Sequence, residues 1–256
     1  MSIPPIDQAT VDQAVALTQE AGRRTLRWFR SPDLHLEHKD DGTPVTNADR
    51  DAERYLRQKL AQDFPGDGVL GEEEAPTPSS TGRRWILDPI DGTKGFIRGV
   101  ALYSNLLALE DEYGIALGVI NLPALGETVW AGRGLGCWSE RGPARVSDHA
   151  ALPGASVMTT SLSRWRPSQI EAFRAAGTTL RTEGDGYGYA LVATGRADAM
   201  IDLIVEPYDV GPMPVILSEA GGRFTDLTGQ PGLAGGSGLA TNGLIHDEVL
   251  ALLREG

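Results

Sequence analysis

The chain has 256 residues, of which 41% are hydrophobic and 23% are charged. These proportions are typical of a folded globular protein and exclude a disordered chain, and the length suffices for one large domain or two closely packed halves. The formal net charge of −12 disfavours a nucleic-acid-binding protein, which needs a basic surface to neutralise phosphates. An acidic protein can still bind phosphates where metal cations reverse the local charge.

Several classes of protein lack support in this sequence. The single cysteine, Cys137, excludes an internal disulfide and a cysteine-based zinc site. The N-terminus has no basic start followed by an apolar core, and no apolar run approaches the ~18 residues of a membrane span. We therefore expect a cytoplasmic protein that binds neither membranes nor nucleic acids.

Two helices are predicted in the first 65 residues. Apolar residues recur at three- and four-residue steps from Ile6 to about Phe29, as on one face of a helix. Thr46 or Asn47 is suited to cap a second helix, which runs to about Phe64.

Short strands are predicted through the rest of the chain, with helices among them in the second half. Strands are expected at residues 69–71, 84–87, 106–109, 115–122, 129–131, 155–160, 199–202 and 223–226. Helices are expected at residues 169–176, 189–194 and 209–220. Because strands and helices do not alternate strictly, the pattern favours layered sheets and helices over a dinucleotide-binding fold.

Carboxylate side chains stand at the ends of these predicted elements. They are Asp49, Glu72, Asp88, Asp91 and Asp209. Taken alone, Asp49 could be a helix cap and Glu72 part of a solvated acidic run. Asp88 and Asp91 are more informative, because they flank a proline-stiffened turn directly after an apolar strand. Such a turn directs hard oxygen ligands to one point, which suits Mg²⁺.

The residues after this turn suggest an anion site. Gly92 and Thr93 allow backbone N–H groups at the start of a following helix to face an anion. A metal site next to a phosphate cradle indicates a hydrolase.

Four groups of residues resemble the inositol monophosphatase superfamily of magnesium-dependent, lithium-sensitive phosphatases. They are 39–49, 71–73, 85–93, and 207–210 together with 219–222, in family order. The resemblance covers nearly the whole chain and implies an α/β fold, a five-layer αβαβα sandwich. An N-terminal half, residues 1–150, would carry most metal ligands, and a C-terminal half, residues 151–256, would complete the substrate pocket.

The resemblance also implies which residues bind metal. Glu72, Asp88 and the carbonyl of Ile90 would bind a first Mg²⁺, and Asp88, Asp91 and Asp209 a second. A third would rest on Glu72 and waters, and Mn²⁺ could substitute. No ligand departs from the family pattern.

By the same resemblance, Asp49 and Thr93 would form a hydrogen-bonded pair that helps a metal-polarised water to attack phosphorus in line, and Glu72 would assist catalysis. Asp91, Gly92 and Thr93 would also contact the substrate. Similar proteins form homodimers.

Two peripheral stretches resemble the histidinol-phosphatase branch of this superfamily. One is 91–100, and the other is 184–189, Gly-Asp-Gly-Tyr-Gly-Tyr, where that branch has Gly-Asp-Cys-Tyr-Gly-Tyr. The departure is Gly186, where the branch often has cysteine.

Three acidic residues point to the same branch. Asp185, Asp202 and Glu206 are expected beside the leaving-group pocket, where they would attract the cationic groups of histidinol. Asp202 and Glu206 could instead be surface or capping residues, and Asp202 could equally bind a hydroxyl of inositol.

The sequence therefore predicts a magnesium-dependent phosphatase that hydrolyses the small phosphate monoester L-histidinol phosphate, as in histidine biosynthesis. One alternative is inositol-1-monophosphatase activity, or action on another small sugar or nucleotide phosphate. Another is a catalytically inactive, metal-binding regulatory paralogue, which the intact ligand set and the Asp49–Thr93 pair disfavour.

Overall fold

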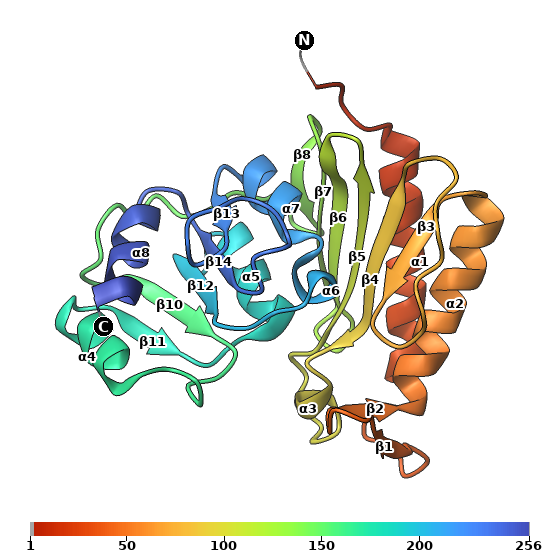
Figure 1. Ribbon diagram of the computed structural model, residues 1–256, viewed down its shortest axis with the longest axis horizontal. Helices are drawn as coiled ribbons and strands as arrows, with labels where there is room; N and C mark the ends of the chain where they lie inside the picture. Colours follow the sequence, from red (N-terminus) through yellow and green to blue (C-terminus); the bar gives the residue numbers. More distant parts are fainter. Residues whose placement is uncertain (1–2, 256) are drawn as a thin grey trace.

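The computed structural model describes residues 3–255 and arranges them in five layers (Figure 1). Two long helices cover one face of a seven-stranded sheet, and shorter helices lie between that sheet and a five-stranded one. Two further helices cover the outer face of the second sheet. This αβαβα order confirms the predicted fold. Among the described residues, no helix is long and apolar enough to cross a membrane.

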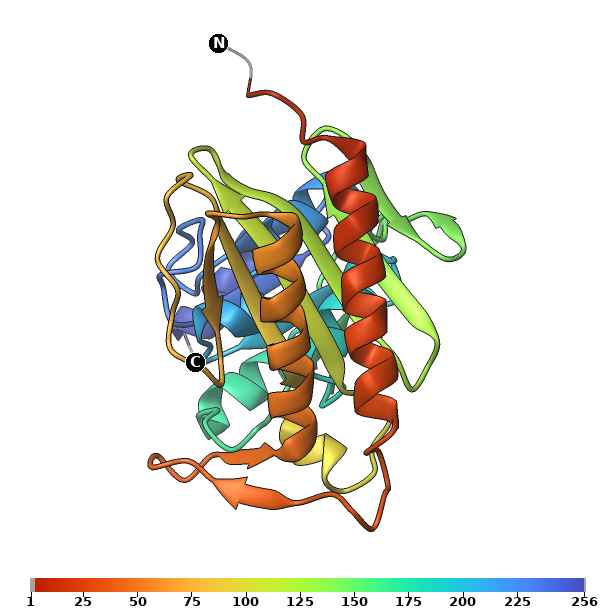
Figure 2. The ribbon, with the colours of Figure 1, turned by 90° about the vertical axis from the view of Figure 1, so that its right-hand side faces the viewer.

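The first sheet has the strand order β3-β4-β5-β6-β7-β8-β9, and all its neighbouring pairs are antiparallel except β3 and β4. Its strands are β3 (Gly68–Gly71), β4 (Arg84–Asp91), β5 (Ser104–Asp111), β6 (Gly114–Leu122), β7 (Glu127–Gly132), β8 (Gly136–Ser139) and β9 (Gly142–Pro143). Helices α1 (Gln8–Leu26) and α2 (Asn47–Asp63) run side by side across its outer face (Figure 2).

Helix α2 begins and packs as its sequence predicts. The side chain of Thr46 accepts hydrogen bonds from backbone N–H groups of the first turn, and Asp49 accepts from the backbone N–H of Thr46. Ala52, Leu56 and Leu60 follow at four-residue steps on the buried face. Thr46 is therefore confirmed as the cap of this helix.

The second sheet has the order β11-β10-β12-β14-β13. Its strands are β10 (Ser156–Thr159), β11 (Thr179–Arg181), β12 (Ala199–Asp202), β13 (Arg223–Thr225) and β14 (Gly238–Thr241). The middle layer contains α5 (Asp185–Ala193), α6 (Pro207–Val210) and α7 (Met213–Ala220), and the outer layer contains α4 (Pro167–Ala175) and α8 (His246–Glu255). A small hairpin of β1 (Leu36–His38) and β2 (Pro44–Thr46) lies beside α3 (Thr93–Phe96) at one end (Figure 1).

Two sequence predictions need correction. The single helix expected at 209–220 is two helices, because α6 ends at Val210 and α7 begins at Met213. Pro212 between them has no backbone N–H to continue the helical hydrogen bonds. The strand expected at 84–87 extends through Asp91, so the proline-containing segment is part of the sheet and not a turn after it.

His246 joins the ends of β13 and β14 at the start of α8. Its Nε2 and Nδ1 atoms each lie 2.9 Å from a hydroxyl oxygen, of Thr225 and Thr241 respectively. Since the Thr225 hydroxyl donates to the carbonyl of Asp226, it accepts from Nε2, and Nδ1 accepts from Thr241. Burial, followed by the positive charge of Arg223, lowers the pKa of His246 to about 4.

Acidification should therefore weaken the fold through His246. Below about pH 6.5 the unfolded chain binds a proton that the folded protein does not bind until about pH 4, so stability is lost as the pH falls through this window. We expect a loss on the order of 3 kcal/mol in the free energy of unfolding once the pH has fallen through the whole window. His246→Gln cannot titrate, so its urea-unfolding free energy should lack this component. A difference between wild type and variant that is independent of pH would contradict the assignment.

Candidate active site

Strand β4 carries Asp88 and Asp91. Residues three apart in a regular strand point to opposite faces. Here Asp88 pairs with Leu106 of β5 and Asp91 pairs with Ser104, so β4 contains one extra residue between the pairs. Leu106 and Ser104 are two residues apart and share a face of the sheet. The bulge in β4 therefore turns both carboxylates to that face.

Buried amides on β5 and β6 support the bulge. Pro89 cannot donate a hydrogen bond within the sheet, but its carbonyl accepts one of 2.6 Å from Nδ2 of Asn105. Asn121 donates in turn to Oδ1 of Asn105 at 2.9 Å. Both asparagines are buried, so these hydrogen bonds fix the irregular backbone in place.

Asp209 joins these two carboxylates from the middle layer. It lies in α6, where its Oδ2 accepts a hydrogen bond of 2.8 Å from the backbone N–H of Glu206. One carboxylate oxygen each of Asp88, Asp91 and Asp209 lies within 4.8 Å of the others. The structure thus brings together three of the predicted metal ligands.

The three carboxylates repel one another strongly. Burial, followed by repulsion from Glu72, Asp91 and Asp209, raises the pKa of Asp88 well above its usual range. Burial and repulsion from Asp185 and Asp209 raise the pKa of Asp91 in the same way, and burial raises that of Asp209 to about 7. Among the described residues, no lysine or arginine forms an ion pair with these three side chains. A buried acidic site with oxygen ligands and no countercharge fits a divalent cation.

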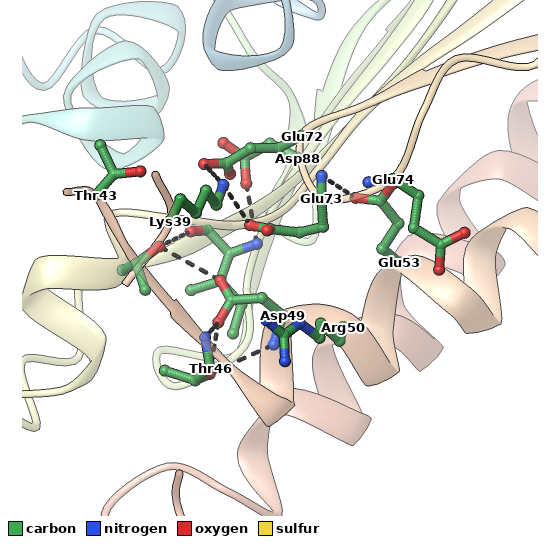
Figure 3. A network of polar contacts seen from close by, with 12 residues as sticks. Lys39, Thr43, Thr46, Asp49, Arg50, Glu53, Glu72, Glu73, Glu74 and Asp88 are labelled. Atoms are coloured by element: carbon green, nitrogen blue, oxygen red, sulfur yellow. Dashed lines mark hydrogen bonds and ion pairs between the residues drawn. The ribbon is translucent and has the colours of Figure 1, made fainter. Parts of the chain in front are cut away.

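Glu72, the fourth predicted ligand, lies outside this group and contacts Lys39 (Figure 3). The Nζ atom of Lys39 is 2.8 Å from a carboxylate oxygen of Glu72 and 2.9 Å from one of Glu73. Burial lowers the pKa of Lys39, but its hydrogen bonds with the two glutamates outweigh burial and raise it. Burial and repulsion from Glu72 raise the pKa of Glu73 to about 7. Lys39 begins the stretch 39–49, but its contact with Glu72 was not expected from the sequence.

Asp49 and Thr93 lie next to each other, as expected. The hydroxyl of Thr93 is 2.9 Å from the carbonyl oxygen of Ile90 and 3.4 Å from Oδ1 of Asp49, so its one hydrogen has two acceptors. The other oxygen of Asp49 accepts hydrogen bonds from the backbone N–H and the hydroxyl of Thr46. Burial, only partly offset by these hydrogen bonds, raises the pKa of Asp49 to about 6.

The start of α5 contacts the acidic cluster directly. Gly186 donates its backbone N–H to Oδ2 of Asp91, which also accepts from the hydroxyl of Ser104 at 2.8 Å. A Cβ at Gly186 would collide with Oγ of Ser104 and lie 2.9 Å from Asp91 Oδ2, so any larger residue would have to displace these side chains. Asp185 has a left-handed backbone with φ of 53°, and its carboxylate lies against Gly92. Burial, then repulsion from Asp202, raises the pKa of Asp185 to about 6.

Asp202 and Glu206 differ in their surroundings. Asp202 is buried, and its oxygens accept hydrogen bonds from the hydroxyl of Tyr189 at 3.0 Å and from the backbone N–H of Thr160 at 3.2 Å. Glu206 is exposed at the start of α6. The structure therefore brings Asp185 to the cluster, holds Asp202 behind it, and leaves Glu206 at the solvent edge.

A five-layer fold with a cluster of carboxylates between its two sheets is the arrangement of a phosphatase whose site is suited to metal ions. Comparison with known proteins agrees. The sequence model of the inositol monophosphatase family matches residues 7–256. A histidinol-phosphatase from Mycobacterium tuberculosis is 44% identical, over 95% of this chain and 97% of its own length. One from Chlorobaculum parvum is 41% identical, over 95% and 96%.

Solved structures show the same architecture. The extragenic suppressor protein SuhB from Bartonella henselae superposes with a TM-score of 0.90 and 26% identity, over 97% of this chain and all of that one. The IMPase from Thermotoga maritima gives a TM-score of 0.86 and 30% identity, over 97% and 98%. The chain therefore belongs to the inositol monophosphatase family, and the proteins similar to it include three named histidinol-phosphatase.

Asp91→Asn should separate the function of the cluster from its stability. An asparagine oxygen in the place of Oδ2 keeps the hydrogen bonds from Gly186 and Ser104, while one repelling charge is removed. We expect phosphatase activity to fall about 100-fold or more. The metal-free variant should melt at a higher temperature than metal-free wild type, because mutual repulsion is relieved. Undiminished turnover, or full wild-type activity after chelation, would contradict a metal role for the cluster.

Thr93→Ala tests the pair with Asp49. The hydroxyl lies between Ile90 and Asp49 and has no other partner among the described residues, so its loss should affect the attacking water more than substrate binding. We expect kcat to fall by about 100-fold and KM to change little. Steady-state kinetics in which KM rises and kcat stays constant would show that Thr93 only binds substrate.

Proposed function

We propose that this phosphatase hydrolyses L-histidinol phosphate to L-histidinol and inorganic phosphate, with Mg²⁺ bound at the acidic centre. The observation that carries the proposal is a second acidic group beside the metal cluster. Asp185 stands next to Asp91 and Gly92, close enough to raise the pKa of Asp91, and Asp202 lies behind it. Relatives named histidinol-phosphatase, 37–44% identical over most of the chain, support it.

The ligand groups fit Mg²⁺. Asp88, Asp91 and Asp209, joined by Glu72 and the carbonyl of Ile90, would hold two to three Mg²⁺ ions, with Mn²⁺ able to replace them. All five offer oxygen atoms, which Mg²⁺ prefers. Ions bound there supply positive charge that neutralises phosphate oxygens and lowers the pKa of coordinated water. The ammonium of Lys39 competes with such an ion for Glu72.

Thr93 would orient the attacking water. While its hydrogen points to Asp49 or Ile90, the Thr93 oxygen accepts a hydrogen bond from the water, whose lone pair then faces phosphorus. The new oxygen–phosphorus bond would form as the ester bond breaks, and the leaving alkoxide would take a proton from solvent water. The proton of the water passes to Thr93 as Thr93 gives its own to Asp49, whose pKa of about 6 suits acceptance near neutral pH.

Backbone groups would help to hold the phosphate. Gly92 has φ of 86°, and this left-handed conformation allows the chain to turn from β4 into α3. The first N–H groups of a helix lack partners within the helix. At Gly92 and Thr93 they are available to phosphate oxygens beside Asp91.

The cationic end of histidinol would meet Asp185, Asp202 and Glu206. Tyr189 and Thr160 hold Asp202 in a fixed orientation, which limits the entropy lost on binding. A charged hydrogen bond in a partly desolvated pocket contributes roughly 1.5–3 kcal/mol. A neutral sugar alcohol cannot gain this, so the pocket should favour a cationic leaving group.

A second candidate is hydrolysis of inositol or sugar phosphates. A Thermotoga maritima relative named fructose-1,6-bisphosphatase/inositol-1-monophosphatase is 33% identical over 82% of this chain. Asp202 could accept a hydrogen bond from a sugar hydroxyl. A catalytically inactive paralogue is not proposed, because every group assigned above is present. For either substrate we propose a cytoplasmic homodimer, as is common in the family.

A substrate panel combined with Asp185→Asn tests the proposal. Asparagine tolerates the left-handed backbone of Asp185, so the substitution removes the charge and retains the conformation. With Mg²⁺, wild type should show its highest kcat/KM on L-histidinol phosphate, compared with inositol 1-phosphate, fructose 1,6-bisphosphate and phosphoadenosine phosphate. Asp185→Asn should lower kcat/KM for histidinol phosphate about tenfold or more and leave inositol 1-phosphate nearly unchanged.

Glu183→Gln is the matched control, since Glu183 is an acid two residues away that pairs with Arg181. Glu183→Gln should leave kcat/KM unchanged for both histidinol phosphate and inositol 1-phosphate. Equal losses on both substrates in Asp185→Asn would assign Asp185 to the fold. A highest kcat/KM on any other member of the panel would overturn the substrate assignment.

A further inference from the structure

Helix α2 contains a buried carboxylate that catalysis does not use. The side chain of Glu53 is fully buried, and its charge is balanced by Arg57, whose Nε lies 2.8 Å from Oε1. The two oxygens of Glu53 also accept backbone hydrogen bonds from Glu73 at 2.9 Å and from Glu74 at 3.0 Å (Figure 3). Glu53 is thus hydrogen-bonded to the backbone of the two residues directly after Glu72.

This contact requires a close approach of the two segments. Gly71 ends β3, and a Cβ at this position would collide with Oε1 of Glu53. The carboxylate of Glu53 cannot move aside easily, because it is buried and hydrogen-bonded on both oxygens. Gly71 therefore allows the carboxylate to reach the N–H groups that follow.

One helix serves two parts of the site. Asp49 and Glu53 are four residues apart and face the same side of α2. Asp49 reaches Thr93 at the start of α3, just after β4, and Glu53 reaches the segment after β3. Since β3 and β4 are adjacent parallel strands, α2 sets the position of the Glu72 segment relative to Asp88 and Thr93.

We infer that Glu53 is a positioning residue that holds Glu72 in the orientation required for metal binding. The inference rests on the proposed role of Glu72 as a metal ligand. Backbone N–H groups pull the segment toward α2 at Glu73 and Glu74, and this leaves Glu72 on the side of Asp88, whose pKa its charge raises. Without Glu53, two buried N–H groups lose their acceptor and the segment is free to shift.

Metal binding measured by calorimetry tests this without relying on catalysis. Metal-free protein is titrated with Mn²⁺, and thermal unfolding is recorded for each variant. In Glu53→Gln the amide presents a donor to one of the two N–H groups, so we expect the Kd for Mn²⁺ to rise by about 10- to 100-fold. Gly71→Ala should have an effect in the same direction by displacing the carboxylate of Glu53 with no change of charge.

Two reference variants separate positioning from general destabilisation. Leu60→Ala removes a buried side chain near the C-terminal end of the same helix, about two turns beyond Glu53, and should lower the melting temperature with no change in the Kd for Mn²⁺. Glu72→Gln removes the ligand itself and should weaken Mn²⁺ binding at least as much as Glu53→Gln. Weaker binding in Glu53→Gln and Gly71→Ala, with wild-type binding in Leu60→Ala, supports the inference.

Three results would overturn it. One is a Kd for Mn²⁺ in Glu53→Gln equal to that of wild type while Glu72→Gln binds weakly. Another is equal weakening in Leu60→Ala, which would make the effect one of stability. The third is unchanged binding in Glu72→Gln, which would also remove Glu72 from the metal site. If histidinol phosphate proved not to be the preferred substrate, these comparisons of the Kd for Mn²⁺ would be unaffected.

Discussion

Three carboxylates lie in the interior within 4.8 Å of one another, and the arrangement of the site depends on their repulsion. Each is oriented by neutral donors: the N–H of Ile90 for Asp88, the Ser104 hydroxyl and Gly186 N–H for Asp91, and the N–H of Glu206 for Asp209. Neutral donors fix direction but leave most of the charge in place. A site built in this way is unfavourable by itself and gains its stabilisation from a bound cation.

The halves of the molecule meet at this repulsive centre. The first sheet contributes Asp88 and Asp91, and the middle layer contributes Asp209 together with the start of α5. The hydrogen bond from Gly186 to Asp91 crosses between them, so the spacing of the layers determines the shape of the site. A cation bound by both halves would strengthen their contact as well as serve catalysis.

Much of this arrangement follows from local sequence. The apolar residues before Asp88 predict a buried strand, the Asp-Pro-Ile-Asp-Gly-Thr sequence indicates ligands and a phosphate cradle, and the Thr46 cap sets the start of α2. The bulge in β4 was not predictable, because it is defined by the register with β5. Pro212 could have indicated the break between α6 and α7, but the helix expected at 209–220 ran through it.

Long-range contacts explain what else the sequence did not reveal. Lys39 meets Glu72 from a hairpin 33 residues away, and Glu53 meets backbone atoms that no side-chain pattern identifies. The left-handed backbone of Asp185 is also unusual for a residue other than glycine, and arises where α5 packs against Gly92 and Thr160. Such features depend on how elements dock, and a linear pattern encodes them only weakly.

Because of the extra residue in β4, the site depends on the number of residues between Asp88 and Asp91 as well as on which residues they are. Shortening the segment between Asp88 and Asp91 by one residue would restore regular pairing with β5. The two acids would then be an even number of positions apart and still share a face. What would be lost is the local bend that the bulge introduces just before the chain leaves β4 for Gly92 and Thr93. An insertion would place two extra residues opposite the same two-residue step of β5 and enlarge the bulge. Natural variation within the family should therefore conserve the length of this segment more strictly than the identity of Pro89 or Ile90.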